Sequence, residues 1–153
     1  MKIFAKGIVT VVCIMLIWTV NLWAEQLRGI VGKSETWGVG WIDLESFTDF
    51  KKGDQIRIRI GGTAKKVLVR FLEKGDSPDS PVGIEGDSFQ VPAYRVLTIT
   101  LKTNYTKVKQ ISIHGGPNPW GMFPLGEDNG PATVISIERI TGKTSGNGSR
   151  WEE

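Results

Sequence analysis

Hydrophobic and polar residues alternate along residues 54–60 with a period of two. Ile56, Ile58 and Ile60 fall on one face of an extended chain, and Arg57 and Arg59 fall on the other. This pattern predicts an antiparallel strand with one face in a core and the other in solvent. Outside the N-terminal segment no stretch shows a helical period, so we expect an all-β protein.

Other short segments share this strand character. We expect residues 66–73, which follow two glycines, to form a hairpin with residues 54–60. Residues 133–140 are β-branched at both parities, which is typical of a strand covered on both faces. The remaining candidates are residues 36–44, 82–84, 89–91, 95–101 and 107–113. About eight short strands separated by glycine, proline and Asp/Asn/Ser turns predict one antiparallel β-sandwich, most simply a jelly roll.

The N-terminus reads as a secretory signal. Lys2 and Lys6 precede an apolar run over residues 8–18, and Ala24 stands before the polar Glu25. We expect residues 1–24 to be a signal peptide that is cleaved after Ala24, which predicts a secreted or periplasmic protein. The alternative is an uncleaved membrane anchor, because the apolar character of residues 7–24 is near the length needed to span a bilayer.

Composition narrows what remains after cleavage. The 153 residues include one cysteine, Cys13, which lies in the signal peptide, so the mature chain is no disulfide scaffold. The signal also carries two of the 19 basic residues and none of the 16 acidic ones, which leaves a net charge of +1. This balance, without a basic run, argues against nucleic acid or a membrane surface as a partner. We expect one domain over residues 25–140 and a flexible tail over residues 141–153.

The order of four segments resembles a known fold. These are LESF at 44–47, KGD at 52–54 before a strand, VKQISI at 108–113 and VISIERI at 134–140. Their order is similar to that of the galactose-binding-like jelly roll of many carbohydrate-binding modules, over roughly residues 29–140. The resemblance implies a sandwich of eight or nine strands that binds sugars through loops or a concave face, often with a structural calcium.

Candidate ligand-binding residues lie on the loop 114–124 and on the segment 36–44. Trp120 offers a flat apolar surface for a sugar ring, and Asn118 can hydrogen-bond hydroxyl groups. Trp37 and Trp41 share a face if their segment is extended. In each case the alternative is structural, since Trp120 can cap one end of the sandwich and Trp37 and Trp41 can belong to the core. The only histidine, His114, is a candidate hydrogen-bonding residue beside them.

The sequence offers no catalytic set. His114 has no second histidine beside it for a zinc site, and no G-x-S-x-G turn locates a nucleophile. We therefore expect a non-catalytic, secreted module that binds carbohydrate, or alternatively a structural or protein-interaction β-sandwich of the cell envelope with a protein partner there. No cofactor is expected, although a structural calcium could collect oxygen ligands from Asp76, Asp79, Glu85 and Asp87.

Overall fold

The structure is a computed structural model, and it describes residues 22–77, 82–117, 125 and 129–142. These residues form nine strands: β1 (Leu22–Gln26), β2 (Gly29–Ser34), β3 (Val39–Phe50), β4 (Gln55–Gly62), β5 (Lys66–Glu73), β6 (Ile84–Gln90), β7 (Val96–Thr100), β8 (Tyr105–His114) and β9 (Ala132–Gly142). Within these ranges no helix is long and apolar enough to cross a bilayer.

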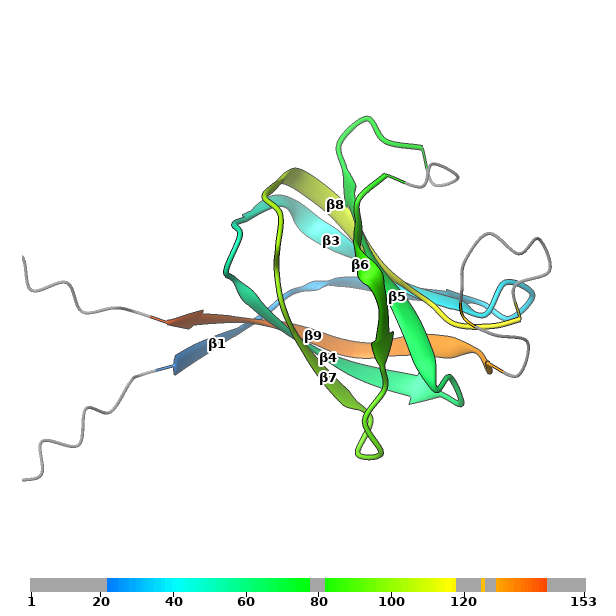
Figure 1. Ribbon diagram of the computed structural model, residues 1–153. Helices are drawn as coiled ribbons and strands as arrows, with labels where there is room; N and C mark the ends of the chain where they lie inside the picture. The colour runs from blue at the N-terminus through cyan, green and yellow to red at the C-terminus, as the bar shows by residue number, and fades with distance from the viewer. Residues whose placement is uncertain (1–21, 78–81, 118–124, 126–128, 143–153) are drawn as a thin grey trace, which may run out of the picture.

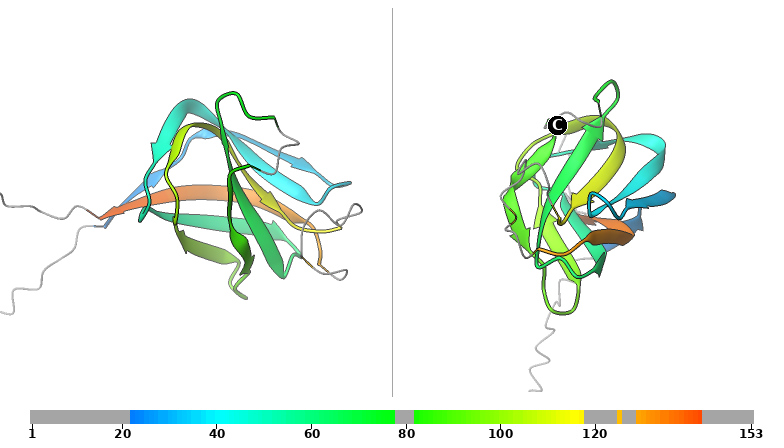
Figure 2. Two further views of the ribbon diagram at one scale, coloured as in Figure 1. Left: turned by 45° about the horizontal axis from the view of Figure 1, so that its top comes forward. Right: turned by 90° about the vertical axis from the view of Figure 1, so that its right-hand side faces the viewer.

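The strands build two antiparallel sheets that pack face to face (Figure 1, Figure 2). Sheet A has the order β1-β9-β4-β7, and sheet B has the order β2-β3-β8-β5-β6. Apart from the hairpins β2–β3 and β5–β6, each connection crosses from one sheet to the other. This interleaving is that of a jelly roll with β2 added at one edge. The predicted all-β jelly-roll sandwich is therefore confirmed, with nine described strands instead of about eight.

The hairpin expected between residues 54–60 and 66–73 is wrong. Strand β4 pairs with β7 and β9, whereas β5 pairs with β6 and β8 in the opposite sheet. Between them the amides of Thr63 and Ala64 both donate to the carbonyl of Pro131, which ties the crossing chain to the start of β9. Two glycines thus mark a change of sheet here, where the sequence pattern alone favoured a tight turn.

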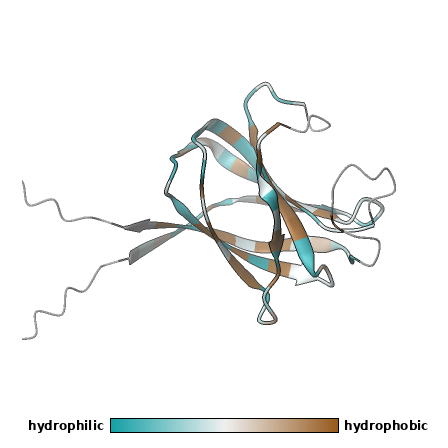
Figure 3. Ribbon diagram, in the orientation of Figure 1, coloured by the Kyte–Doolittle hydropathy of each residue, from teal (hydrophilic) through white to brown (hydrophobic). Residues whose placement is uncertain are grey.

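The core lies between the sheets and follows the predicted alternation. Ile56, Ile58 and Ile60 are buried, while Arg57 and Arg59 point outward, and Figure 3 shows the resulting bands of hydrophobic and hydrophilic residues along the strands. Three aromatic rings add a stack to this core. Phe50 meets Phe71 edge-on at 5.2 Å between ring centroids, and Phe71 stacks on Tyr105 at 4.6 Å. The aromatic stack joins β3, β5 and β8 of sheet B.

Strand β9 is covered on one face over most of its length. Val134 and Ile137 are buried in the core, but Ile135 is 56% exposed on the outer side of sheet A. The expectation that residues 133–140 are covered on both faces is therefore wrong. β-Branched residues suit an extended backbone whichever side they face, so their presence at both parities does not measure burial.

A buried carboxylate lies at the edge of the core. Glu85 on β6 is almost inaccessible, and it accepts hydrogen bonds from the Tyr105 hydroxyl and from the amide of Lys102. Burial and the neighbouring carboxylate raise the pKa of the Tyr105 hydroxyl, which therefore stays protonated and keeps donating. This pair fastens β6, an edge strand, to the connection between β7 and β8.

The first and last strands of the sandwich pair with each other. Strand β1 pairs with the end of β9, from Leu22 opposite Gly142 to Gln26 opposite Glu138 (Figure 1). Arg139 donates two hydrogen bonds to Glu25, at 2.7 and 3.1 Å, and lies 5.4 Å from the centroid of the Phe50 ring. Strand β1 thus includes residues 22–24 of the expected signal peptide. Cleavage after Ala24 stays a prediction, and it would leave the Glu25–Arg139 pair in the chain.

The opposite end holds a junction of backbone segments around Gly38, in the turn between β2 and β3. The carbonyl of Gly38 accepts hydrogen bonds from the amides of Gly115 and Ala132, at 2.9 and 3.1 Å. Gly38 has a φ of 60°, and a Cβ there would overlap the carbonyl of Gly116. The junction therefore joins the β2–β3 turn to the end of β8 and the start of β9, and it needs a residue without a side chain at position 38.

Replacing Gly38 by alanine should destabilise the fold strongly. A left-handed conformation costs a non-glycine residue about 1–2 kcal/mol, and the overlap with Gly116 adds about 1–3 kcal/mol. Gly53→Ala is the matched control, because Gly53 also has a positive φ, 96°, but has open space around its Cα. Urea unfolding should show a larger loss for Gly38→Ala than for Gly53→Ala, and equal losses would contradict the role assigned to the junction.

Candidate functional site

The outward-facing side of sheet B carries most of the candidate residues that the structure describes. On β3, Trp41 points outward because its neighbours Gly40 and Ile42 are buried in the core. In the ladder Trp41 lies between Gly32 of β2 and Ser112 of β8, and Ser112 lies opposite Arg70 of β5. These four residues form one row across the sheet. We call the side of sheet B that carries this row, and that points away from the core, the outer face.

The outer face is covered over one half and open over the other. On the β8–β5 side, Leu68, Leu72, Arg70 and Ser112 are each less than 5% exposed although they point away from the core. The Arg70 guanidinium donates to the carbonyls of Val82 and Ser77, at 2.9 and 2.8 Å, which holds the β5–β6 connection against this half. On the β2–β3 side, by contrast, Ile30 is 75% exposed. A ligand can therefore reach the outer face over β2 and β3.

Trp41 lies flat on the open half. A Cβ added at Gly32 would overlap the indole and meet its Cε2, Cζ2 and Nε1 atoms at nearly equal distances. Such distances place the ring face-on above the Gly32 backbone, so its opposite face points away from the sheet. The side chain is partly exposed. Glycine on the neighbouring strand is what lets the indole lie down, because any side chain at position 32 would push it up.

A polar pair lies two residues along β3 from Trp41. The Gln110 amide donates to the carboxylate of Asp43, at 2.7 Å, and the two residues face each other across β3 and β8. Asp43 is exposed and Gln110 is partly exposed. The pair keeps unused acceptor and donor capacity, since a carboxylate accepts about four hydrogen bonds and a primary amide donates two. It can therefore bind a hydroxylated ligand that rests on Trp41.

His114 belongs to the same face but to its covered side. Its Nε2 shares a hydrogen bond of 3.0 Å with the Ser112 hydroxyl, and it lies opposite Val39 and Leu68 in the ladder. Burial and the nearby Arg70 guanidinium lower the pKa of His114 to about 4. The imidazole is therefore neutral at pH 7. A base this weak, beside a serine that is only 4% exposed, does not favour a nucleophile–base pair.

The other expected ligand-binding residues fall in two groups. Trp37 lies in the turn beside Gly38 and is 46% exposed, and Trp41 is outside the core cluster, so the core alternative is wrong for both. Asn118 and Trp120 lie outside the described residues. The stem from which they emerge is described: the Gly116 amide donates to Gly130, at 2.6 Å. The structure thus brings Trp41 and His114 to one side of sheet B, with Trp37 exposed in the turn before β3.

Several residues of this face were missed from the sequence. In the sequence these are the polar positions of alternating strands, and such positions usually contact only water. The residues are Arg70, Gln110 and Ser112. Their grouping depends on the register between β3, β8 and β5, which places side by side residues that are 42 (Arg70 and Ser112) to 71 (Trp41 and Ser112) positions apart in the sequence. A signal was available only for Gly32, since an isolated glycine in a strand can mark a close approach.

The calcium ligands suggested by the sequence do not converge in the described part of the chain. There, no group of three or more His, Cys, Asp or Glu side chains is placed to hold a metal ion. Glu85 is engaged by Tyr105 and Lys102, and Asp76 accepts a hydrogen bond from the amide of Glu73. Asp79 lies outside the described residues.

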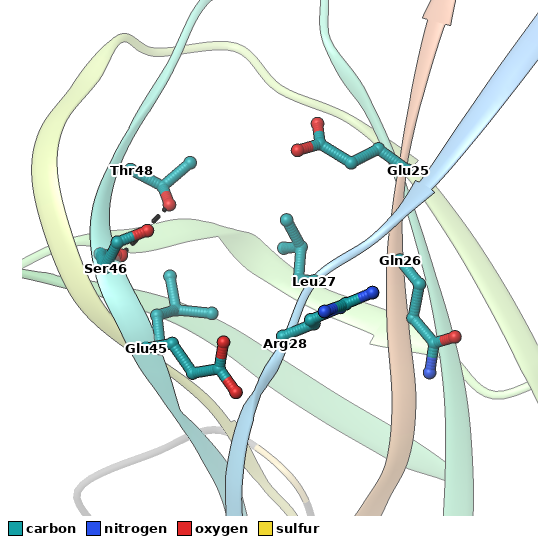
Figure 4. A pocket seen from close by; sticks show the side chains of 8 residues that line it. Glu25, Gln26, Leu27, Arg28, Glu45, Ser46 and Thr48 are labelled. Atoms are coloured by element: carbon teal, nitrogen blue, oxygen red, sulfur yellow. Dashed lines mark hydrogen bonds between the residues drawn. The ribbon is translucent and has the colours of Figure 1, made fainter.

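A pocket of about 460 Å³ lies away from the outer face, where the chain passes from β1 to β2 (Figure 4). It opens because β3 advances five residues from Asp43 to Thr48 while β8 advances two, which is a bulge. Leu27 points into the space between Thr48 and Glu25. The Glu25 carboxylate is already bound by Arg139, so we place the candidate site on the outer face instead. The lining residues are Glu25, Gln26, Leu27, Arg28, Leu44, Glu45, Ser46 and Thr48.

The low pKa of His114 predicts a pH dependence of stability. Because the pKa is about 4 in the folded protein and ordinarily 6.5, the unfolded chain takes up this proton first. Stability from the neutral imidazole is complete above pH 6.5 and is lost as the pH falls toward 4, by about 3 kcal/mol at most. In urea unfolding at pH 7 and pH 4, His114→Gln should lose less stability than the wild type, and equal losses would refute the assignment.

Comparisons with known proteins assign no family to this chain. No family model matches it, and no curated protein or solved structure matches it either. The function of the outer face is therefore argued from its own geometry and chemistry: an indole lying flat on a strand, a hydrogen-bonded acid–amide pair beside it, and a neutral histidine at the border of the covered half.

Proposed function

We propose that the protein is a secreted, non-catalytic module that binds carbohydrate on the open half of the outer face. The observation that carries this proposal is the flat indole of Trp41 above Gly32. The ring face that is turned away from Gly32 offers an apolar plane for the C–H side of a sugar ring, the contact that aromatic side chains commonly make with neutral sugars. Asp43 and Gln110 then supply acceptors and donors to the hydroxyl groups at the ring edge.

The electrostatics of this half support a neutral ligand. Asp43 carries a negative charge and lies on the same face of β3 as Trp41, two residues further along the strand. This charge disfavours an acidic sugar at that position. On the neighbouring covered half, His114 also carries no charge at pH 7, because its pKa is about 4. The sequence resemblance to galactose-binding-like modules points to the same class of ligand, and the expected signal peptide accounts for access to extracellular glycans.

A second candidate function is protein interaction in the cell envelope. It is favoured by the free edge of sheet B, where Ile30 is 75% exposed and Val31 is 49% exposed. A sandwich can use such an edge for a partner whatever its outer face binds. The two functions differ in the residues they need, because sugar binding depends on Trp41 and edge binding depends on the backbone of β2.

Trp41→Ala should abolish or strongly weaken retention on polysaccharide. Native gels containing a neutral β-glucan, a xylan or a galactan can measure the retardation of each variant. Losing the stacking plane should weaken binding about tenfold or more, equivalent to about 1.4 kcal/mol. Tyr94→Ala is the matched control, because Tyr94 is an aromatic residue that is 75% exposed in the connection from β6 to β7, at the other edge of sheet B.

Two results would count against this function. If none of the neutral polysaccharides retards the wild-type protein, the sugar proposal fails. If retardation occurs but Trp41→Ala and Tyr94→Ala reduce it equally, sugar binding stands and the outer face is the wrong site. A circular-dichroism melt of both variants shows that the losses do not come from unfolding.

A further inference from the structure

The backbone of β2 has a free side along its whole length. The Glu45 amide donates to the carbonyl of Arg28, so Arg28 and Glu45 form a hydrogen-bonded pair in the antiparallel ladder. Since such pairs alternate, Ile30, Gly32 and Ser34 bond to β3, and Gly29, Val31 and Lys33 direct their N–H and C=O groups away from the sheet. In the described part of the chain nothing bonds to these outward groups.

This edge has few of the features that usually prevent strand pairing. Strand β2 contains no proline and no bulge against β3, with six consecutive pairs from Gly29–Leu44 to Ser34–Val39. Its large side chains are exposed, Ile30 on the outer face and Val31 on the opposite face. Lys33 is the only charged residue in the strand, and it is already paired with Glu35 at 2.9 Å. The other edge of sheet B differs, because β6 pairs with β5 through a register shift.

We infer that β2 pairs with β2 of a second copy of this chain, antiparallel and about a two-fold axis at Val31. The outward hydrogen bonds allow this register, since Val31 then faces Val31, and Gly29 faces Lys33. Ile30 faces Gly32, a large residue opposite one without a side chain. Neither Arg28 nor Lys33 meets a like charge, because they face Ser34 and Gly29. The strand is thus self-complementary in size and charge.

The pairing has a consequence for the outer face. It joins two five-stranded sheets into one of ten strands, with both Trp41 rings on the same continuous surface. Ile30 of the second copy packs beside the indole that lies over Gly32, and so completes one side of the Trp41 surface. Two such surfaces bind a repeating polymer with a higher effective affinity than one. The self-association does not depend on the identity of that ligand.

The association is weak and depends on concentration. A single pair of six-residue strands buries less surface area than a standard protein–protein interface, which buries roughly 1,200–2,000 Å². Sedimentation velocity of the exported, purified protein from about 10 μM to about 1 mM should show a monomer that converts reversibly to a dimer. A protein that stays monomeric over this range, or forms larger species without a dimer, overturns the inference.

Two variants test whether β2 is the contact. Val31→Pro removes an outward N–H and no bond to β3, so the monomer should keep its fold while the dimer constant weakens at least tenfold. Ile30→Ser removes the exposed side chain and is a second route if the proline variant unfolds. Ile135→Ser is the matched control on sheet A and should leave association unchanged. Association that Val31→Pro and Ile30→Ser do not weaken overturns the inference.

Amide hydrogen exchange gives a site-specific measurement. In the monomer the Ile30 amide is bonded to β3 and protected, whereas the Val31 amide is open to solvent. Protection of Val31 should therefore rise with protein concentration, while that of Ile30 stays nearly constant. Protection that rises elsewhere, with Val31 unchanged, means that the copies meet through another surface and refutes the pairing of β2.

Discussion

The arrangement of the candidate site depends on one backbone junction, the carbonyl of Gly38 shared by the amides of Gly115 and Ala132. It holds together the β2–β3 turn and the start of β9, and thereby one end of both sheets. Gly40 continues the close approach, since a Cβ there would overlap the backbone of Thr133 and Val134. Two sheets with side chains between them normally lie about 10 Å apart, and only glycine lets their backbones come closer. Trp41 and His114 are positioned relative to one another because this end is fixed.

The core of the sandwich could be predicted from the sequence because it depends on local alternation. Ile56, Ile58 and Ile60 are buried together as their period requires, and the jelly-roll class follows from the number and spacing of such segments. Partner choice could not be predicted in the same way. Strands β4 and β5 are neighbours in sequence and lie in different sheets, because the hydrogen bonds to Pro131, almost 70 residues later, decide where the chain crosses.

The candidate site shows the same division between local and long-range information. Trp41 and His114 stand out in the sequence by residue type, but Gln110 and Ser112 acquire a role only through the register of β8 against β3. The core interpretation of Trp41 failed for a specific reason. Strand β3 alternates Gly40 and Ile42 inward, so the small glycine takes the core position and the large tryptophan the outer one. From side-chain size alone, Trp41 would be expected in the core and Gly40 on the outer face. The close approach of β9 to Gly40 decides instead which alternate residues of β3 face the core.

The asymmetry of the outer face explains why its polar residues behave differently. On the covered half the Arg70 guanidinium donates to backbone carbonyls, so its charge serves to fix the β5–β6 connection. Burial, together with this charge, lowers the pKa of His114. On the open half Asp43 keeps access to solvent and accepts a hydrogen bond from Gln110. Ser112 lies at the border and links the halves through its bond to His114. A ligand on Trp41 would therefore lie beside a covered half that buried hydrogen bonds hold in place. On its other side the open half ends at β2, the one strand of sheet B that the eight-stranded jelly-roll pattern does not require.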